Sequence, residues 1–187
     1  GKIAIDTKTM NLSLLSASAH KIGGPKGVGF LYDKESVKLE PIIYGGGQER
    51  GLRGGTENVP GIVGLGKALE LMKKIDTKAI GNSREYFMRE LESIGGKING
   101  SKNSEERLYN NIHVSFDTNA SNLVAYLSHK GIYVSTGSAC ESKSDKEDHV
   151  LRAIGLSKKD IDGSIRVTLN DKITKADVLR VVKEVKS

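Results

Sequence analysis

Lys21 lies among small residues in the stretch Ser16-Ala17-Ser18-Ala19-His20-Lys21-Ile22-Gly23-Gly24-Pro25-Lys26-Gly27. Residues 13–18 read as a short strand that runs into this stretch, and residues 27–32 read as a second strand after it. Lys21 is therefore predicted on a turn between strands. Such a setting suits a lysine that forms Schiff bases, and the nearby hydroxyls, imidazole and amides could bind phosphate. A surface lysine in a tight turn is the alternative.

The rest of the chain alternates between helical and strand-like segments. A glycine-rich, irregular segment at 44–58 precedes two predicted helices, at 60–74 and 78–94, the second ending at Gly95-Gly96. The predicted strands and helices that follow are 111–116, 119–130, 131–135, 146–154, 164–169 and 175–186. This alternation predicts an α/β protein. We place the domain boundary at the glycines, which gives domains at 1–96 and 97–187.

Composition narrows the class of protein. The chain has 187 residues, of which 37% are hydrophobic and 28% charged, as in soluble globular proteins. No apolar run approaches the roughly 20 residues of a membrane-spanning helix. The start of the chain lacks a signal-peptide pattern, and one cysteine cannot form an internal disulfide, so a cytoplasmic setting is expected. The net charge is +6, but lysines are spread out without aromatic neighbours, which argues against nucleic-acid binding.

The single cysteine, Cys140, lies in a run of small and polar residues at 134–142. Such a run is untypical of a core and favours an accessible, reactive thiol over a buried structural one. A reactive thiol needs thiolate character, and nothing in this run lowers its pKa below the usual value of about 8.5. Activation would have to come from a bound cofactor or substrate.

Three further residues are candidates for anion binding. Arg50 and Arg53 lie in the glycine-rich segment, where a flexible backbone and guanidinium groups could bind phosphate, although an irregular connector is an equal alternative. Arg166 lies on a predicted strand and could bind a carboxylate if its face lines a cleft. No metal is expected, because the four histidines show no close pair at ligand spacing. A serine hydrolase is also unsupported, since no Gly-x-Ser-x-Gly motif is present.

Three segments in this order resemble the NifS/IscS-type cysteine desulfurases, which are class V aminotransferases. These are the Lys21 stretch at 16–27, Gly45-Gly46-Gly47-Gln48-Glu49-Arg50-Gly51-Leu52-Arg53-Gly54-Gly55-Thr56, and Ser135-Thr136-Gly137-Ser138-Ala139-Cys140. The resemblance extends to residues 150–155 and 165–169, and so covers essentially the whole chain.

The resemblance implies the aminotransferase-like fold, called fold type I, and pyridoxal 5'-phosphate as cofactor. Residues 1–96 would be a remnant of the large cofactor-binding domain, and residues 97–187 the small C-terminal domain. Lys21 matches the lysine that forms the Schiff base, and Ser18 and His20 match residues on the phosphate side. Thr56 matches a threonine that reaches the cofactor phosphate of the neighbouring subunit, which implies a homodimer.

The resemblance also implies a reaction. Arg166 matches the arginine that binds the substrate carboxylate, and Cys140 matches the nucleophile that takes sulfur from L-cysteine as a persulfide and leaves L-alanine. The sulfur would pass to an iron–sulfur scaffold or another acceptor protein, for cluster assembly or tRNA thiolation. A selenocysteine lyase, and a non-catalytic fragment that docks sulfur-acceptor proteins, are the alternatives.

The chain departs from the family in its length. Family members are about twice as long, and their N-terminal half supplies the aspartate that pairs with the cofactor ring nitrogen and the histidine stacked on the ring. We therefore expect this chain to be a C-terminal portion that is poorly active or inactive by itself.

Overall fold

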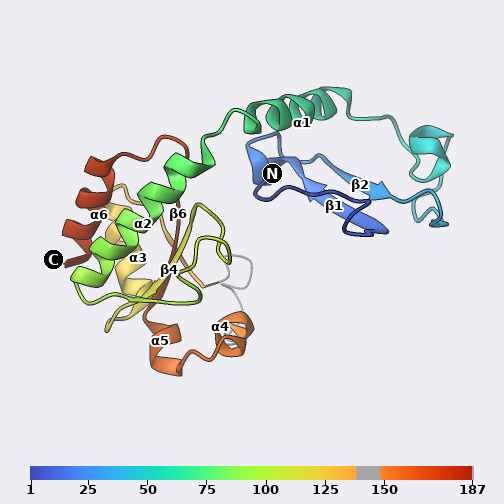
Figure 1. Cartoon of the computed structure of the whole chain (residues 1–187). Helices are drawn as coiled ribbons and strands as arrows, with labels where there is room; N and C mark the ends of the chain where they lie inside the picture. Colours follow the sequence, from blue (N-terminus) through green and yellow to red (C-terminus); the bar gives the residue numbers. More distant parts are fainter. Residues whose placement is uncertain (138–147, 187) are drawn as a thin grey trace. The chain divides into compact units, whose positions relative to one another are not determined.

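The computed structural model describes residues 1–137 and 148–186. The chain folds into two compact units, Gly1–Ile75 and Asp76–Ser187 (Figure 1). The boundary differs from the one predicted at residues 96 and 97. Helix α2 (Thr77–Ser93) contacts strands β3 (Lys97–Ile98) and β4 (Asn111–Ser115), so it belongs to the second unit rather than to the first.

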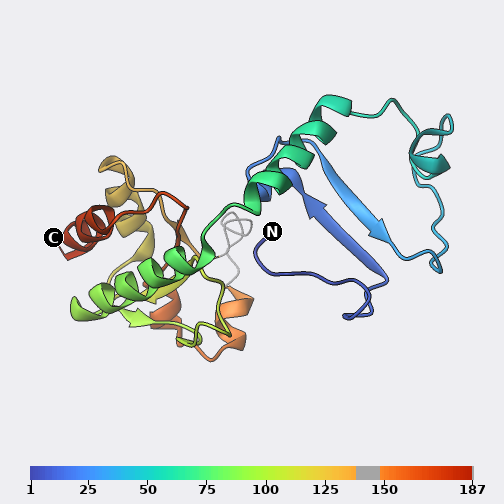
Figure 2. The same ribbon diagram turned by 45° about the horizontal axis from the view of Figure 1, so that its top comes forward.

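The first unit is built on a two-stranded antiparallel hairpin. Strand β1 (Leu14–Ser18) pairs with β2 (Gly29–Asp33), and helix α1 (Val59–Met72) lies alongside the hairpin (Figure 2). Two short 3-10 helices, η1 (Ala19–Ile22) and η2 (Gln48–Gly51), complete it. Both predicted strands and the helix predicted at 60–74 are confirmed within two residues.

Local signals explain where α1 begins. The side chain of Asn58 accepts a hydrogen bond from the Gly61 amide at 3.1 Å, and Pro60 occupies the first turn, where its missing N–H has no helical partner to lose. The buried face of α1 carries small or aliphatic residues, Gly61, Leu65 and Ala68.

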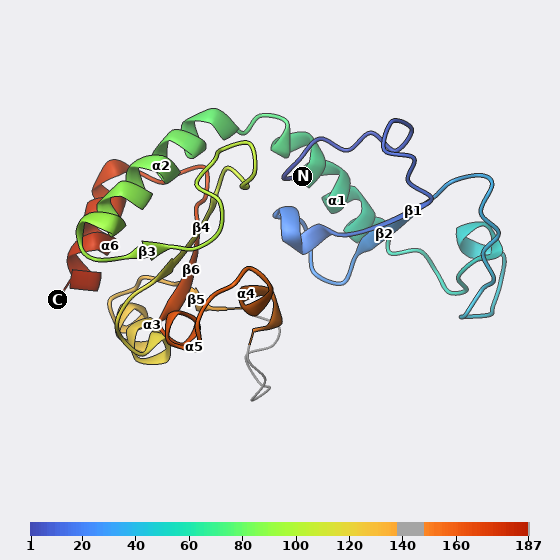
Figure 3. The same ribbon diagram turned by 60° about the horizontal axis from the view of Figure 1, so that its bottom comes forward.

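The second unit contains a four-stranded antiparallel sheet in the order β3-β4-β6-β5, with β5 at Ser135–Thr136 and β6 at Ser164–Thr168. Helices α2, α3 (Ala120–His129) and α6 (Lys175–Lys186) lie on one side of this sheet (Figures 1 and 3). The hydrophobic core of this unit lies between the sheet and these helices. Its members with at most 1% exposure are Phe87, Leu91, Ile112, Val114, Leu127, Ile165 and Val178.

Prediction succeeded best for the long elements of this unit. The strands at 111–116 and 164–169 and the helices at 78–94, 119–130 and 175–186 are confirmed. The strand predicted at 131–135 is wrong in its bounds, because only Ser135–Thr136 pairs with β6. Helix α4 (His149–Ala153) begins later than predicted, with residues 146 and 147 outside the described part, and the short β3 and α5 (Lys158–Asp162) were not predicted. Among the described helices, none is long and apolar enough to cross a membrane.

Candidate functional site

Lys21 lies on the 3-10 turn η1, between the two strands, as predicted. Ala19 anchors this turn: its side chain is fully buried, and its amide donates to the Val28 carbonyl at 3.0 Å. Gly23 ends the turn with φ of +80°, a conformation that favours glycine, and the Gly24 amide donates to the Ala19 carbonyl at 2.9 Å. The turn is thus held by its backbone and by Ala19.

The side chains of Ser18, His20 and Lys21 are exposed around this anchored backbone. Within the described residues, none of the three makes a side-chain hydrogen bond or ion pair. A hydroxyl, an imidazole and a primary amine therefore lie close together along the chain, and none of them is engaged by another described residue. This donor set fits pyridoxal phosphate, whose aldehyde reacts with a lysine amine and whose phosphate accepts hydrogen bonds.

The glycine-rich segment is anchored at the other end of the hairpin. Arg50 of η2 forms an ion pair with Asp33 at 3.2 Å. In the hairpin, Asp33 lies opposite Leu14 at one end, whereas Ser18 lies opposite Gly29 at the other end, next to Lys21. A five-residue strand spans about 13 Å between its end residues, and the segment that contains η2, in cyan, lies beyond the far end of the hairpin (Figure 1). The segment with Thr56 is therefore not part of the Lys21 turn.

Glycine is required where this segment crosses itself. A Cβ added at Gly54 would lie 2.7 Å from the Gly45 Cα, and the Gly54 amide donates to the Ile43 carbonyl at 2.9 Å. The irregular conformation predicted for 44–58 is confirmed apart from η2. Its side chains Arg53 and Thr56 are exposed.

Arg166 lies in the second unit, on β6, where it is paired with His113 of β4 and with Ser135 of β5. Its side chain is half-buried and has no hydrogen bond or ion pair with any other described residue. A half-buried guanidinium without an acidic partner is suited to binding a carboxylate in bidentate fashion.

A buried hydrogen-bond network beside Arg166 was missed by the sequence reading. The Asn99 amide nitrogen lies 3.0 Å from His113 Nδ1 and donates to Ser115 Oγ at 2.7 Å, and Ser115 Oγ donates to the Asp160 carbonyl at 2.7 Å. The alternation of Asn111, His113 and Ser115 with buried aliphatic residues was the available signal.

Burial lowers the pKa of His113 to about 4. The negative charge of Asp148 opposes this shift, and the positive charges of Arg107 and Arg166 add to it. The imidazole is therefore uncharged at neutral pH.

Asp148 begins helix α4. Its Oδ1 accepts hydrogen bonds from the amides of Val150 at 3.0 Å and Leu151 at 3.1 Å. Gly137, with φ of +33°, passes so close that a Cβ there would lie 2.8 Å from Asp148 Oδ2. Cys140, the predicted nucleophile, lies outside the described residues.

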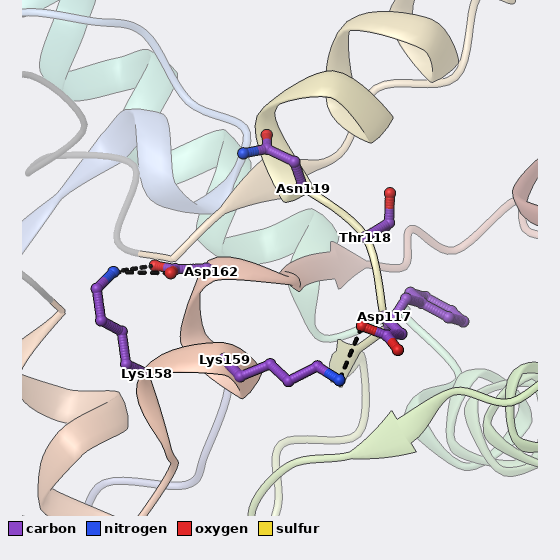
Figure 4. Close-up of a pocket in the computed structure, with 7 residues that line it drawn as sticks. Asp117, Thr118, Asn119, Lys158, Lys159 and Asp162 are labelled. Atoms are coloured by element: carbon purple, nitrogen blue, oxygen red, sulfur yellow. Dashed lines mark hydrogen bonds and ion pairs between the residues drawn. The ribbon is translucent and has the colours of Figure 1, made fainter.

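One surface pocket of the second unit contains none of the predicted site residues (Figure 4). It is lined by residues 116–119 and by Lys158, Lys159 and Asp162. Its lysines are already paired, Lys158 with Asp162 at 2.7 Å and Lys159 with Asp117 at 3.0 Å. In the described part of the chain, no group of three histidine or acidic residues has the arrangement of a metal site.

Residues 1–181 match the family model described as Aminotransferase class-V. The chain belongs to this family. The predicted resemblance to class V aminotransferases is thereby confirmed, and individual relatives confirm the resemblance to NifS/IscS-type cysteine desulfurases.

A "Cysteine desulfurase IscS" from Clostridium botulinum is 47% identical over 184 residues, covering 95% of this chain and 46% of the relative. A solved "NifS-like protein" is 37% identical with a TM-score of 0.85, covering 99% of this chain and 48% of that one. A structure titled "SspA in complex with cysteine" is 36% identical with a TM-score of 0.70, covering 90% and 47%.

These similarities confirm the predicted fold class, the C-terminal part of the aminotransferase-like fold. The chain spans about half the length of the curated relatives it matches. The roles predicted for Lys21, Ser18, His20, Thr56, Arg166 and Cys140 remain predictions.

Proposed function

We propose that this chain is part of a cysteine desulfurase that uses pyridoxal phosphate. The observation that carries the proposal is the η1 turn, where Lys21 is presented with His20 and Ser18 by a backbone that the buried Ala19 anchors. The names of the relatives, cysteine desulfurase and NifS-like protein, support the reaction class.

In this proposal the turn holds the cofactor. Lys21 Nζ would bind the cofactor aldehyde, while the Ser18 hydroxyl and the His20 imidazole would donate hydrogen bonds to its phosphate. Bound pyridoxal phosphate acts as an electron sink for an attached amino acid. Lys21, when displaced by the substrate, can move a proton at the substrate's α-carbon.

Arg166 and Cys140 would act on the substrate. Arg166 has no acidic partner among the described residues, so its guanidinium can bind the carboxylate of L-cysteine. The Cys140 thiolate would attack the substrate sulfur and form a persulfide as the Cβ–S bond of L-cysteine breaks. The electron pair of that bond would stay with the amino acid, whose Cβ takes up a proton to leave L-alanine. The persulfide sulfur would then pass in the cytoplasm to an iron–sulfur scaffold or another acceptor protein.

Thr56 would serve a second subunit. Its segment is anchored at the end of the hairpin away from Lys21, through the Arg50–Asp33 ion pair. A threonine so placed cannot easily reach the phosphate bound near Lys21 of its own chain, which supports a homodimer in which it contacts the partner's cofactor.

The test is reduction with borohydride in the presence of pyridoxal phosphate, followed by peptide mass analysis. Selective labelling of Lys21, lost in Lys21→Arg and retained in the control Lys26→Arg, supports the proposal. Labelling spread over surface lysines would contradict it. Release of alanine from L-cysteine then tests the reaction.

Two alternatives differ in measurable ways. A selenocysteine lyase would release alanine from selenocysteine in strong preference to cysteine. A non-catalytic docking fragment would bind an iron–sulfur scaffold in a pull-down without labelling at Lys21. The docking fragment is worth testing because the chain spans only about half the length of its relatives.

A further inference from the structure

Arg166 is the middle residue of a row that crosses three strands. His113 is its directly opposed neighbour on β4, and Ser135 is its neighbour on β5. Directly opposed residues of antiparallel strands project from the same face, with Cβ atoms about 4.5–5.5 Å apart. The residues that alternate with this row, among them Ile112, Val114 and Ile165, are buried on the other face. The side chains beside Arg166 are therefore an imidazole and a hydroxyl.

The network behind His113 determines which ring nitrogen carries the proton. The single hydroxyl proton of Ser115 goes to the Asp160 carbonyl, so the Asn99 atom facing Ser115 must be a donor, the amide nitrogen. The second proton of this NH2 group then faces His113 Nδ1, at 3.0 Å, which must be an acceptor. His113 is thus held as the neutral tautomer with its proton on Nε2, a buried atom with no hydrogen-bond partner among the described residues.

Besides Arg166, the charged groups that influence His113, Arg107 and Asp148, make hydrogen bonds with other residues. Arg107 donates to the Ser101 carbonyl at 2.6 Å and to Asn111 Oδ1 at 3.1 Å, and also to the Asn99 carbonyl. Among the described residues, Asp148 is the acidic group whose charge acts on His113, and its Oδ1 accepts hydrogen bonds from the first amides of α4. These two hydrogen bonds hold the Asp148 carboxylate at the start of α4.

We propose that His113 is a positioning residue for Arg166: a fixed, uncharged ring that occupies the position opposite the guanidinium without pairing with it. Arg166 is thereby left available for the carboxylate of a bound amino acid, an inference that rests on the proposed function. The opposed position is where an acidic side chain would compete most directly with the substrate, because opposite charges on such a pair attract.

The test compares His113→Asn with His113→Asp in the intact protein loaded with pyridoxal phosphate. Asparagine and aspartate are nearly equal in size and both are shorter than the histidine side chain, but only aspartate offers Arg166 a carboxylate. We expect KM for L-cysteine to be at least about tenfold higher in His113→Asp than in His113→Asn, with a much smaller difference in kcat. His113→Gln, which is longer and uncharged, should restore KM toward the wild-type value. Equal KM values in the Asn and Asp variants would overturn the proposal.

A second measurement separates this proposal from the proposed function. In NMR spectra of the 15N-labelled wild-type chain, we expect the His113 ring to show the resonances of the Nε2–H tautomer down to pH 5. We also expect the Arg166 Nε–H resonance to shift in His113→Asp but not in His113→Asn. An Nδ1–H tautomer, or an Arg166 resonance that is the same in both variants, would overturn the positioning role. If the intact protein that contains this chain releases no alanine from cysteine when loaded with pyridoxal phosphate, the proposed function fails, while these resonances still decide the role of His113. Thermal unfolding of each variant confirms that it is folded.

Discussion

Pro25 packs directly against Gly64 of α1. A Cβ added at Gly64 would lie 2.6 Å from Pro25 Cγ and 2.9 Å from its Cδ, so the ring occupies the space of the missing side chain. Pro25 follows the η1 turn in the chain, and α1 contacts η1. This contact therefore fixes the helix against the segment that presents Lys21.

Gly64→Ala is expected to lower the free energy of unfolding by about 1–3 kcal/mol, because the new methyl group overlaps the Pro25 ring. Gly66→Ala is the matched control: it lies in the same helix with nothing within 4 Å of an added Cβ, and should raise stability by about 0.5–1 kcal/mol. Urea unfolding of both variants measures the difference. Equal effects would show that the Pro25 contact is not tight.

Stability should depend on pH through His113. Its pKa is about 4 when folded, against 6.5 as the ordinary value, so the unfolded chain binds the proton more readily between these values. The contribution is therefore complete above pH 6.5 and is lost as pH falls toward 4. Allowing for partial exposure, it amounts to about 2 kcal/mol. Between pH 7.5 and pH 4.5, the free energy of unfolding should fall by up to about 2 kcal/mol more in the wild type than in His113→Gln. An equal fall in the two proteins would contradict the prediction.

Leu127 of α3 is fully buried, and Leu127→Ala should cost about 2–5 kcal/mol by leaving a cavity in the second unit. Leu179 of α6 is 46% exposed and provides the control, for which we expect a loss below about 1 kcal/mol. Thermal or urea unfolding compares the two. A loss at Leu179 as large as that at Leu127 would mean that the core is not where the structure places it.

Arg166→Lys tests the carboxylate site of the proposed function. Lysine keeps the charge but loses the bidentate fork, so we expect KM for L-cysteine to rise about tenfold or more with a smaller change in kcat. Arg152→Lys, on the exposed surface of α4, is the control and should leave KM within about twofold. Steady-state alanine release from the intact protein loaded with pyridoxal phosphate measures both, and an unchanged KM in Arg166→Lys would remove Arg166 from the site.

Local signals were sufficient for much of this protein. The small residues around Lys21 predicted a turn between strands, Pro60 predicted the start of α1, and Gly95 with φ of +92° follows the end of α2 as expected. These features depend on the conformational preferences of a few neighbouring residues, which the sequence states directly. The three motifs that indicated the family are of the same kind.

The domain boundary and the surroundings of Arg166 were decided only by tertiary structure. The glycines after α2 indicated where the helix ends, but not that its buried face, with Phe87 and Leu91, packs on the second sheet. Strand register brings His113 opposite Arg166, and the fold brings Asn99 and the Asp160 carbonyl to Ser115. Pairings between residues so distant along the chain depend on how the whole sheet and its helices pack, which short-range patterns do not specify.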